Sequence, residues 1–255
     1  MIGCGKMGGA LLDHWMTGDE NFTIVDPGLE HAPDGVRLLA DRAALGDERF
    51  DVVVVAIKPQ MIADLIPPYR DHLEPGGYAL SIAAGTSAAR IAQAMGGAPV
   101  VRVMPNLPAA VGRGVSGLYA DPAAETAPLT HAEAMMRRAG ATVSVDSEDK
   151  LDRVTAVAGS GPGYVFEIAR AYVAAATGIG FTEDEARAMV LGTMGGAVAM
   201  AEAHGAPDLE TLRNSVTSKG GTTAAGLDAL NGDDLISARM RETLAAAYNR
   251  AVELR

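Results

Sequence analysis

Residues 1–16, MIGCGKMGGALLDHWM, contain the glycine pattern on which the fold of the first half depends. Gly3, Gly5 and Gly8 spell G-x-G-x-x-G, and the residues after them can continue as a helix with Leu11 on its apolar side. This spacing occurs where a strand turns into a helix whose N-terminus binds a phosphate group. The pattern is weak by itself, so its meaning depends on the next segments of the chain.

A short strand and an acid come after the glycines at a suitable distance. Residues 22–25 predict a strand that ends at Asp26, about twenty residues beyond the glycines, where a dinucleotide-binding fold places its ribose-binding acid. Asp26 is equally well explained as a turn residue before a Pro-Gly pair. The strand that should precede the glycines is represented only by Met1 and Ile2, which indicates a truncated start or an unusually short first strand.

Strands and helices then alternate along the chain. The unalternating apolar run from Val52 to Ile57 is typical of a parallel strand that is covered on both faces. Lys58 follows it, at the carboxyl end of a strand, where open α/β sheets bind ligands; a solvated lysine is an equally good explanation. Further strands are expected at residues 78–82, 100–104, 115–119 and 142–145, with helices at 61–65, 87–95 and 132–138. The alternation predicts an α/β fold, with a Rossmann-type doubly wound domain over residues 1–146.

The composition changes after Asp146. Alanine, glycine, leucine and methionine recur there at helical spacing, which predicts an all-α domain over residues 147–255. Its main helices are expected at about residues 164–177, 182–203 and 233–253. Methionines on such helices belong more often to a core or a subunit interface than to a ligand site. The apolar helices therefore predict a homo-oligomer built from dimers through this domain.

Composition and charge exclude several classes of function. A net charge of −11 and a pI of about 4.9 disfavour a nucleic-acid surface, because phosphate binding depends on clustered Lys and Arg. The one cysteine, Cys4, excludes an internal disulfide framework and suits the cytoplasm, and the five histidines show no metal-ligand spacing. No apolar run approaches the roughly 20 residues of a membrane span, and the start is no signal peptide. We therefore expect a cytoplasmic protein with a small-molecule ligand and no metal.

A second glycine-rich stretch is LRNSVTSKGGTTAAGLDAL, residues 212–230. Gly220 and Gly221 leave the backbone uncovered, and Thr222 and Thr223 then open a helix. Several N–H groups should therefore point one way at a positive helix end, where a carboxylate fits. The alternative is a helix break with a threonine N-cap, which is the more frequent explanation of such a stretch taken alone.

With both halves considered, the sequence resembles the pyrroline-5-carboxylate reductase family, whose members make proline by reducing a cyclic imine. The likeness runs from Gly3 to about Leu254. Its strongest motif is VTSKGGTT at residues 216–223, followed by Ala225 and Leu227. The supporting motifs are GCGKM at 3–7, AIKP at 56–59, SIAAG at 81–85, MPN at 104–106 and GSGP at 159–162. Together, in the family's order, these short motifs are specific.

The resemblance implies hydride transfer from NADPH or NADH to the C=N bond of 1-pyrroline-5-carboxylate, giving L-proline. The backbone of residues 221–223 would hold the substrate carboxylate, and the hydroxyl of Thr223, the implied catalytic group, would meet the ring nitrogen. The implied substrate-binding residues are Ser218, Gly220, Gly221, Thr222 and Thr223. The implied cofactor-binding residues are Ile2, Gly3, Cys4, Gly5, Lys6, Met7, Asp26, Ala56, Ile57, Lys58, Pro59, Ile82, Ala83, Ala84 and Asn106.

Cofactor preference is expected to depend on Asp26. Its carboxylate would accept hydrogen bonds from ribose hydroxyls and repel a 2′-phosphate, which favours NADH or weakens a preference for NADPH. Arg37 and Arg42 lie near enough in the sequence to act as phosphate partners. Lys219 stands where the family usually has proline, and this added cation would aid carboxylate capture or alter cofactor choice. Leu107 stands where the family usually has threonine.

Two other functions remain open at this point. A β-hydroxyacid dehydrogenase, or another imine reductase, shares the order of the two domains. The hydroxyacid enzymes carry a catalytic lysine after a glycine-rich turn, whereas residues 162–167, PGYVFE, contain none. A non-catalytic dinucleotide-sensing module is the alternative from another class, and the short first strand is its best argument.

Overall fold

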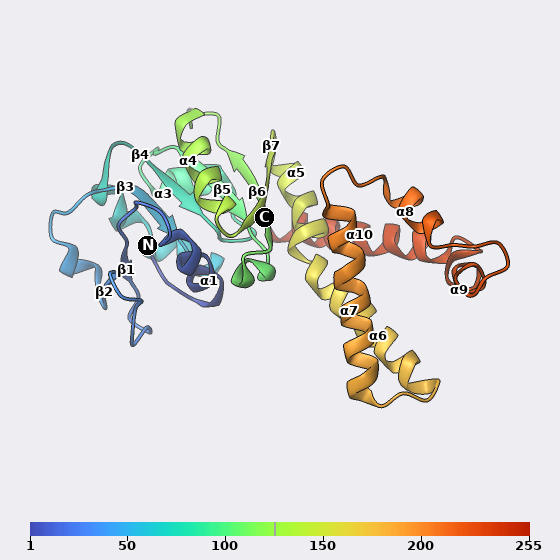
Figure 1. Ribbon diagram of the computed structural model, residues 1–255. Coiled ribbons are helices and arrows are strands. Elements are labelled where there is room, and N and C mark those ends of the chain that lie inside the picture. Colours follow the sequence, from blue (N-terminus) through green and yellow to red (C-terminus); the bar gives the residue numbers. More distant parts are fainter. Residues whose placement is uncertain (125) are drawn as a thin grey trace. The chain divides into compact units, whose positions relative to one another are not determined.

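The computed structural model describes residues 1–124 and 126–255 (Figure 1). The chain divides into two compact units, one of residues Met1–Pro162 with Ala246–Arg255, the other of residues Gly163–Ala245. The predicted boundary after Asp146 lies earlier than this division and stays a prediction. Within the described ranges, no helix is long and apolar enough to cross a membrane.

The first unit is built on a mainly parallel sheet. Strand β1 (Thr23–Val25) pairs with β2 (Arg37–Leu39), and the order β3 (Phe50–Val55), β4 (Leu73–Ser81), β5 (Val100–Met104), β6 (Gly114–Ala120), β7 (Gly140–Val145) forms the other group. Ile2, which lies before β1 in the chain, forms parallel bridges with both Val25 and Val55. This single residue therefore joins the two groups of strands. Only β5 and β6 run antiparallel among the paired strands of the described chain. The predicted α/β doubly wound arrangement is confirmed.

Helices cover both faces of this sheet. They are α1 (Lys6–Trp15), α2 (Ile62–Leu65), α3 (Ala88–Ala94), α4 (Thr126–Arg137) and α5 (Glu148–Val154), with 3-10 turns at Arg42–Leu45, Pro59–Met61, Pro67–His72 and Leu107–Val111. Val53 and Val55 pack into the cluster that contains Ile62 and Ile91, whereas Val54 packs into the cluster of α1 and α4. Alternate residues of β3 therefore enter opposite cores, which is why its run from Val52 to Val55 is apolar without alternation.

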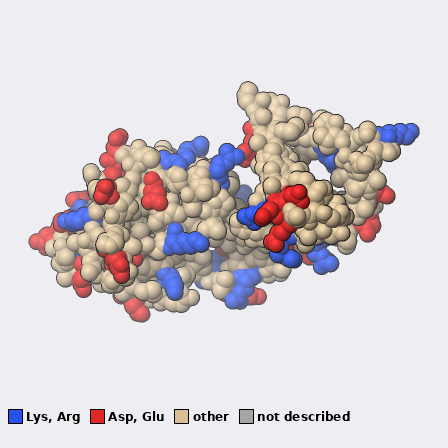
Figure 2. All heavy atoms as spheres, turned by 60° about the horizontal axis from the view of Figure 1, so that its bottom comes forward, with Lys and Arg blue, Asp and Glu red and all other residues tan. Residues whose placement is uncertain are grey.

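The second unit contains only helices. A π-helical turn at Thr155–Gly159 leads into α6 (Gly161–Gly178), and α7 (Glu183–Glu202), α8 (Leu209–Ser215), α9 (Thr222–Asn231) and α10 (Leu235–Leu254) follow. Helix α7 begins with a capping box in which Thr182 and Glu185 satisfy each other's backbone N–H groups. Large apolar side chains such as Phe166 and Met200 are 63% and 58% exposed. Figure 2 shows wide areas of this unit that carry no charged side chain.

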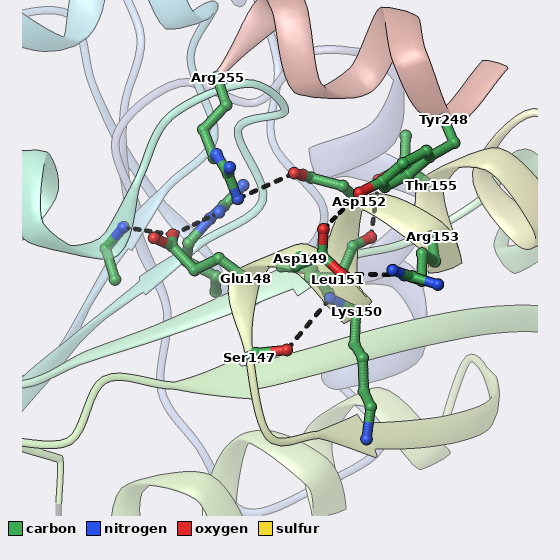
Figure 3. Close-up of polar contacts among 12 residues, drawn as sticks. Ser147, Glu148, Asp149, Lys150, Leu151, Asp152, Arg153, Thr155, Tyr248 and Arg255 are labelled. Atoms are coloured by element: carbon green, nitrogen blue, oxygen red, sulfur yellow. Dashed lines mark hydrogen bonds and ion pairs between the residues drawn. The ribbon is translucent and has the colours of Figure 1, made fainter. Parts of the chain in front are cut away.

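The end of α10 belongs to the first unit and contacts α5 (Figure 3). The hydroxyl of Tyr248 donates a hydrogen bond to Asp149, and the guanidinium of Arg255 lies 3.0 Å from Oδ2 of Asp152. Arg153 lies over the ring of Tyr248, with 5.1 Å between its Cζ and the ring centroid. These contacts fasten the last turns of the chain to α5.

Candidate active site

The three glycines of the first motif occupy positions with different requirements. Gly3 has a φ of +76°, and an added Cβ would lie 2.7 Å from Cγ2 of Ile57. An added Cβ on Gly5 would meet nothing within 4 Å, so the backbone at the start of α1 is open to a ligand. On Gly8 it would lie 2.6 Å from Cε of Met1. A dinucleotide-binding loop needs its first glycine for a tight turn, its second for close approach of the ligand to the backbone, and its third for close packing of the helix. Gly3, Gly5 and Gly8 fit these three roles in that order.

A groove of about 530 Å³ lies beside this turn, outside the carboxyl ends of β1, β2 and β3. This is where open α/β sheets bind their ligands. Of the predicted cofactor residues, the groove is lined by Ile2, Gly3, Cys4, Gly5, Asp26, Ala56, Ile57 and Lys58. The predicted residues that do not line it are Lys6, Met7, Pro59, Ile82, Ala83, Ala84 and Asn106.

Several lining residues were not predicted from the sequence. They are Val25, Pro27, Ala40, Asp41, Met61, Asp64, Leu65, Pro68 and Tyr69. Arg42, which the sequence suggested as a phosphate partner, lines the groove as well. Residues 40–42 reach the groove because they follow β2, whose three residues are too few to show a periodicity. If the sequence had shown a strand at residues 37–39, it would also have placed residues 40–42 at the groove.

Asp26 organises the turn on which it was expected to bind a ribose. Its Oδ2 accepts a hydrogen bond from the N–H of Cys4 at 2.8 Å, and its Oδ1 accepts one from the N–H of Gly28 at 2.9 Å. A carboxylate offers about four acceptor positions, so these bonds leave about two for ribose hydroxyls. Burial and, next, the carboxylate of Asp26 raise the pKa of the Cys4 thiol, which therefore stays protonated.

The two arginines considered as phosphate partners differ in their surroundings. Arg37 forms two hydrogen bonds with the carboxylate of Glu48, at 2.8 and 2.5 Å, and does not line the groove. Arg42 lines the groove. Arg42 is therefore the arginine of this pair that a bound dinucleotide can reach.

The side-chain amide of Asn106 forms hydrogen bonds within the protein. Its Nδ2 donates a hydrogen bond to the carbonyl oxygen of Ala158 at 3.0 Å, and its Oδ1 accepts one from the N–H of Val115 at 2.8 Å. The residue is 6% exposed. Its amide thus joins the loop after β5 to β6 and to the π-helical turn, and its predicted contact with the cofactor stays a prediction.

The second glycine-rich stretch forms the start of α9. Gly220 has a φ of +71°, and Gly221 is the N-cap residue, without a side-chain cap. The explanation by a threonine N-cap is therefore wrong, because both threonines lie inside the helix. Their N–H groups belong to the first turn, which has no intrahelical acceptors. An added Cβ on Gly221 would lie 2.3 Å from Oγ of Ser218, so the chain is tightly folded at this point.

Family models match parts of both units. Residues 148–254 match the family model for pyrroline-5-carboxylate reductase dimerisation, and residues 1–85 match that for NADP oxidoreductase, coenzyme F420-dependent. The chain is 36% identical over 221 residues to the pyrroline-5-carboxylate reductase of Vibrio alginolyticus, covering 86% of this chain and 80% of that protein.

Solved structures give the same result. The structure of a pyrroline-5-carboxylate reductase from Coxiella burnetii matches with a TM-score of 0.91 and 32% identity, over 99% of this chain and 96% of that one. The Plasmodium falciparum pyrroline carboxylate reductase with NADP bound shares the fold, with a TM-score of 0.83 and 22% identity over 99% and 96% of the two chains. This chain therefore belongs to the pyrroline-5-carboxylate reductase family.

Proposed function

We propose that this protein reduces 1-pyrroline-5-carboxylate to L-proline with NADPH or NADH. The observation that carries the proposal is the start of α9, where a helix N-terminus at Gly221 follows Gly220, on which an added Cβ would meet nothing within 4 Å. A carboxylate is the group that such a site binds, and the substrate has one. The curated relatives of similar sequence carry the name of this reductase.

The residues of the groove fit a nicotinamide dinucleotide. The open backbone at Gly5 and the N-terminus of α1 suit a pyrophosphate, and the free acceptor positions of Asp26 suit ribose hydroxyls. Bound there, the dinucleotide supplies the hydride that the C=N bond accepts. Lys58, at the end of β3, adds a positive charge to the lining of the groove.

The chemistry asks the protein for positioning more than for a strong acid. A protonated C=N bond is already an electrophile, so a substrate held in reactive geometry needs little further activation. The backbone N–H groups of residues 221–223 would fix the carboxylate, and the hydroxyl of Thr223 would form a hydrogen bond with the ring nitrogen. This assignment explains how the reaction proceeds without a histidine or lysine as the catalyst.

Cofactor oxidation by the purified protein tests the proposal. Turnover is expected with pyrroline-5-carboxylate, and less with the six-membered piperideine analogue or with hydroxyacids. A sensing module would bind the dinucleotide without oxidising it, and a hydroxyacid dehydrogenase would act on the hydroxyacids instead. Gly221→Val should raise the Michaelis constant for the substrate and leave cofactor affinity unchanged, because its side chain would displace Ser218 and obstruct the carboxylate site, and Gly221 does not line the dinucleotide groove.

A dimer through the helical unit is part of the proposal. The family model that matches residues 148–254 is one of dimerisation, and the exposed apolar side chains of α6 and α7 suit an obligate interface. Light scattering at micromolar concentration should give at least twice the 26.2 kDa of one chain. A mass near 26.2 kDa would contradict the proposed assembly.

We also propose that the protein works in the cytoplasm and binds no nucleic acid. One cysteine and a net charge of −11 support both statements. Cell fractionation would test the first statement, and a gel-shift assay at low salt would test the second.

A further inference from the structure

A buried histidine contacts a cation of the dinucleotide groove. His72 ends the 3-10 turn Pro67–His72 and is 4% exposed. Its Nδ1 lies 2.8 Å from the carbonyl oxygen of Glu48, and its Nε2 lies 3.3 Å from NH1 of Arg42. The guanidinium of Arg42 thus contacts the imidazole of His72, and Arg42 also lines the groove.

The two partners determine the state of this imidazole. A carbonyl oxygen only accepts hydrogen bonds, so Nδ1 must carry the hydrogen that points to Glu48. A guanidinium only donates hydrogen bonds, so Nε2 must be the acceptor for Arg42. The contacts therefore require the neutral tautomer, and a proton added at Nε2 would place two donors and two positive charges against each other.

Arg42 lies on the side of the groove where the adenosine ribose is expected. Val25 of β1 is in register with Leu39 of β2, and the N–H of Asp26 donates to the carbonyl oxygen of Leu39 at 3.0 Å. The ribose-binding acid and residues 40–42 therefore leave the sheet side by side. An arginine near that acid is the usual partner of the 2′-phosphate that distinguishes NADPH from NADH.

We propose that His72 positions Arg42 to bind the 2′-phosphate of NADPH, and that protonation of His72 releases Arg42 and weakens NADPH binding at acidic pH. The proposal rests on the function proposed above, since it concerns the cofactor of that reaction. Asp26 and Arg42 then act in opposite directions on the choice of cofactor. His72 is a positioning residue that acts through Arg42.

The other charged or titratable groups that face His72, within the described part of the chain, keep their charge over the relevant pH range. Tyr69 comes from the same turn, with its ring 6.1 Å from the imidazole, and burial raises the pKa of its phenol. Glu48 comes from the loop before β3, and its hydrogen bonds with Arg37 lower the pKa of its carboxyl.

The test is the pH dependence of binding of both cofactors to the full-length protein. Dissociation constants for NADPH and NADH are measured by fluorescence titration between pH 5.5 and 8. The 2′-phosphate itself gains a proton near pH 6, so the contribution of the protein to the pH dependence is determined by comparing variants with the parent. His72→Gln keeps an acceptor at the position of Nε2 and does not titrate. Arg42→Ala removes the cation, and Arg37→Ala is the matched control outside the groove.

In the parent protein we expect the NADPH dissociation constant to rise about tenfold from pH 8 to pH 5.5, while that for NADH changes little. His72→Gln should bind NADPH like the parent at pH 8. Between pH 8 and pH 5.5, the rise of its NADPH dissociation constant should be at least threefold smaller than the rise in the parent. Arg42→Ala should bind NADPH at least tenfold more weakly at pH 8 and leave NADH binding unchanged. Arg37→Ala should match the parent for both cofactors.

Equal pH profiles for the parent and His72→Gln would overturn the proposal, and so would an unchanged ratio of the two affinities in Arg42→Ala. If His72→Gln does not fold, as judged by circular dichroism, the profile of Arg42→Ala decides, because it must also be flatter than that of the parent. A parent protein that binds neither cofactor at pH 8 would instead refute the proposed function.

Discussion

Replacement of Thr223 by alanine tests whether the hydroxyl of this residue has a catalytic or a structural role. Thr223 is the second residue of α9 and is exposed, and the N-cap position belongs to Gly221. Within the described residues its hydroxyl has no hydrogen-bond partner. Thr223→Ala therefore removes no contact that holds the fold, and it keeps the backbone N–H that would serve the substrate carboxylate.

The expected effects on stability and on activity have different sizes. Alanine has a higher helix propensity than threonine by up to about 0.7 kcal/mol, so the free energy of unfolding should stay constant or rise slightly. The lost hydrogen bond to the ring nitrogen should raise the activation barrier by about 1.5–3 kcal/mol, or roughly ten- to a hundredfold in turnover. Substrate binding should fall less than turnover, because the carboxylate contact remains.

Steady-state kinetics with pyrroline-5-carboxylate, together with urea unfolding, measures both quantities on one preparation. Thr223→Ser is the matched control, since it keeps the hydroxyl at the same helix position, and it should recover much of the turnover. A folded Thr223→Ala protein that turns over like the parent would refute the catalytic role. The glycine stretch would then be only the start of a helix.

The polar contacts of the first unit lead to the other predictions. Asp26→Ser should shift the ratio of kcat/KM values toward NADPH, because it removes a negative charge beside the ribose; a parent with more than tenfold preference for NADPH and no shift in the variant would make this carboxylate a turn residue only. Glu148→Gln should lower the free energy of unfolding by about 2–4 kcal/mol in a urea titration, because the carboxylate pairs at 2.5 Å with Arg102, which is 4% exposed, and accepts the N–H of Ala88 at 2.8 Å. The exposed pair of Asp146 with Lys150 is its control, and Asp146→Asn should lower the free energy of unfolding much less than Glu148→Gln does. Burial raises the pKa of Asp152, so the folded protein binds this proton more tightly than the unfolded chain, and stability is lost as the pH rises through the folded pKa. Asp152→Asn should therefore raise the melting temperature at pH 7 and leave it unchanged near pH 3, whereas a lower melting temperature at pH 7 would show that the ion pair with Arg255 outweighs burial.

Local sequence determined the fold class and the two glycine sites. The run from Val52 to Ile57 indicates a strand covered on both faces because burial on both sides removes the alternation of polar and apolar residues. Gly3 and Gly220 mark backbone turns with positive φ, which side chains other than glycine rarely adopt. Such constraints act within a few residues of each other, so they can be read from the order of amino acids.

Tertiary structure decided which side chains meet around those sites. Arg42 begins one 3-10 turn, whereas Tyr69 and His72 belong to another, Pro67–His72. Nothing in the sequence spacing shows that these two turns approach each other. The sequence likewise did not show that the side-chain amide of Asn106 forms hydrogen bonds with the backbone of Ala158 and Val115. The antiparallel direction of β6 is another such result.

The physical reason is the range of the interactions. Helix starts, glycine turns and apolar periodicity depend on neighbours along the chain, and they determined the Rossmann-type sheet, the helical second half and the glycine turn before α9. The partner of a guanidinium, a carboxylate or an amide depends on which loops the packed core brings together, and many packings satisfy the same local pattern. The tertiary structure alone therefore decided that His72 holds Arg42 at the groove and that Arg37 is paired elsewhere.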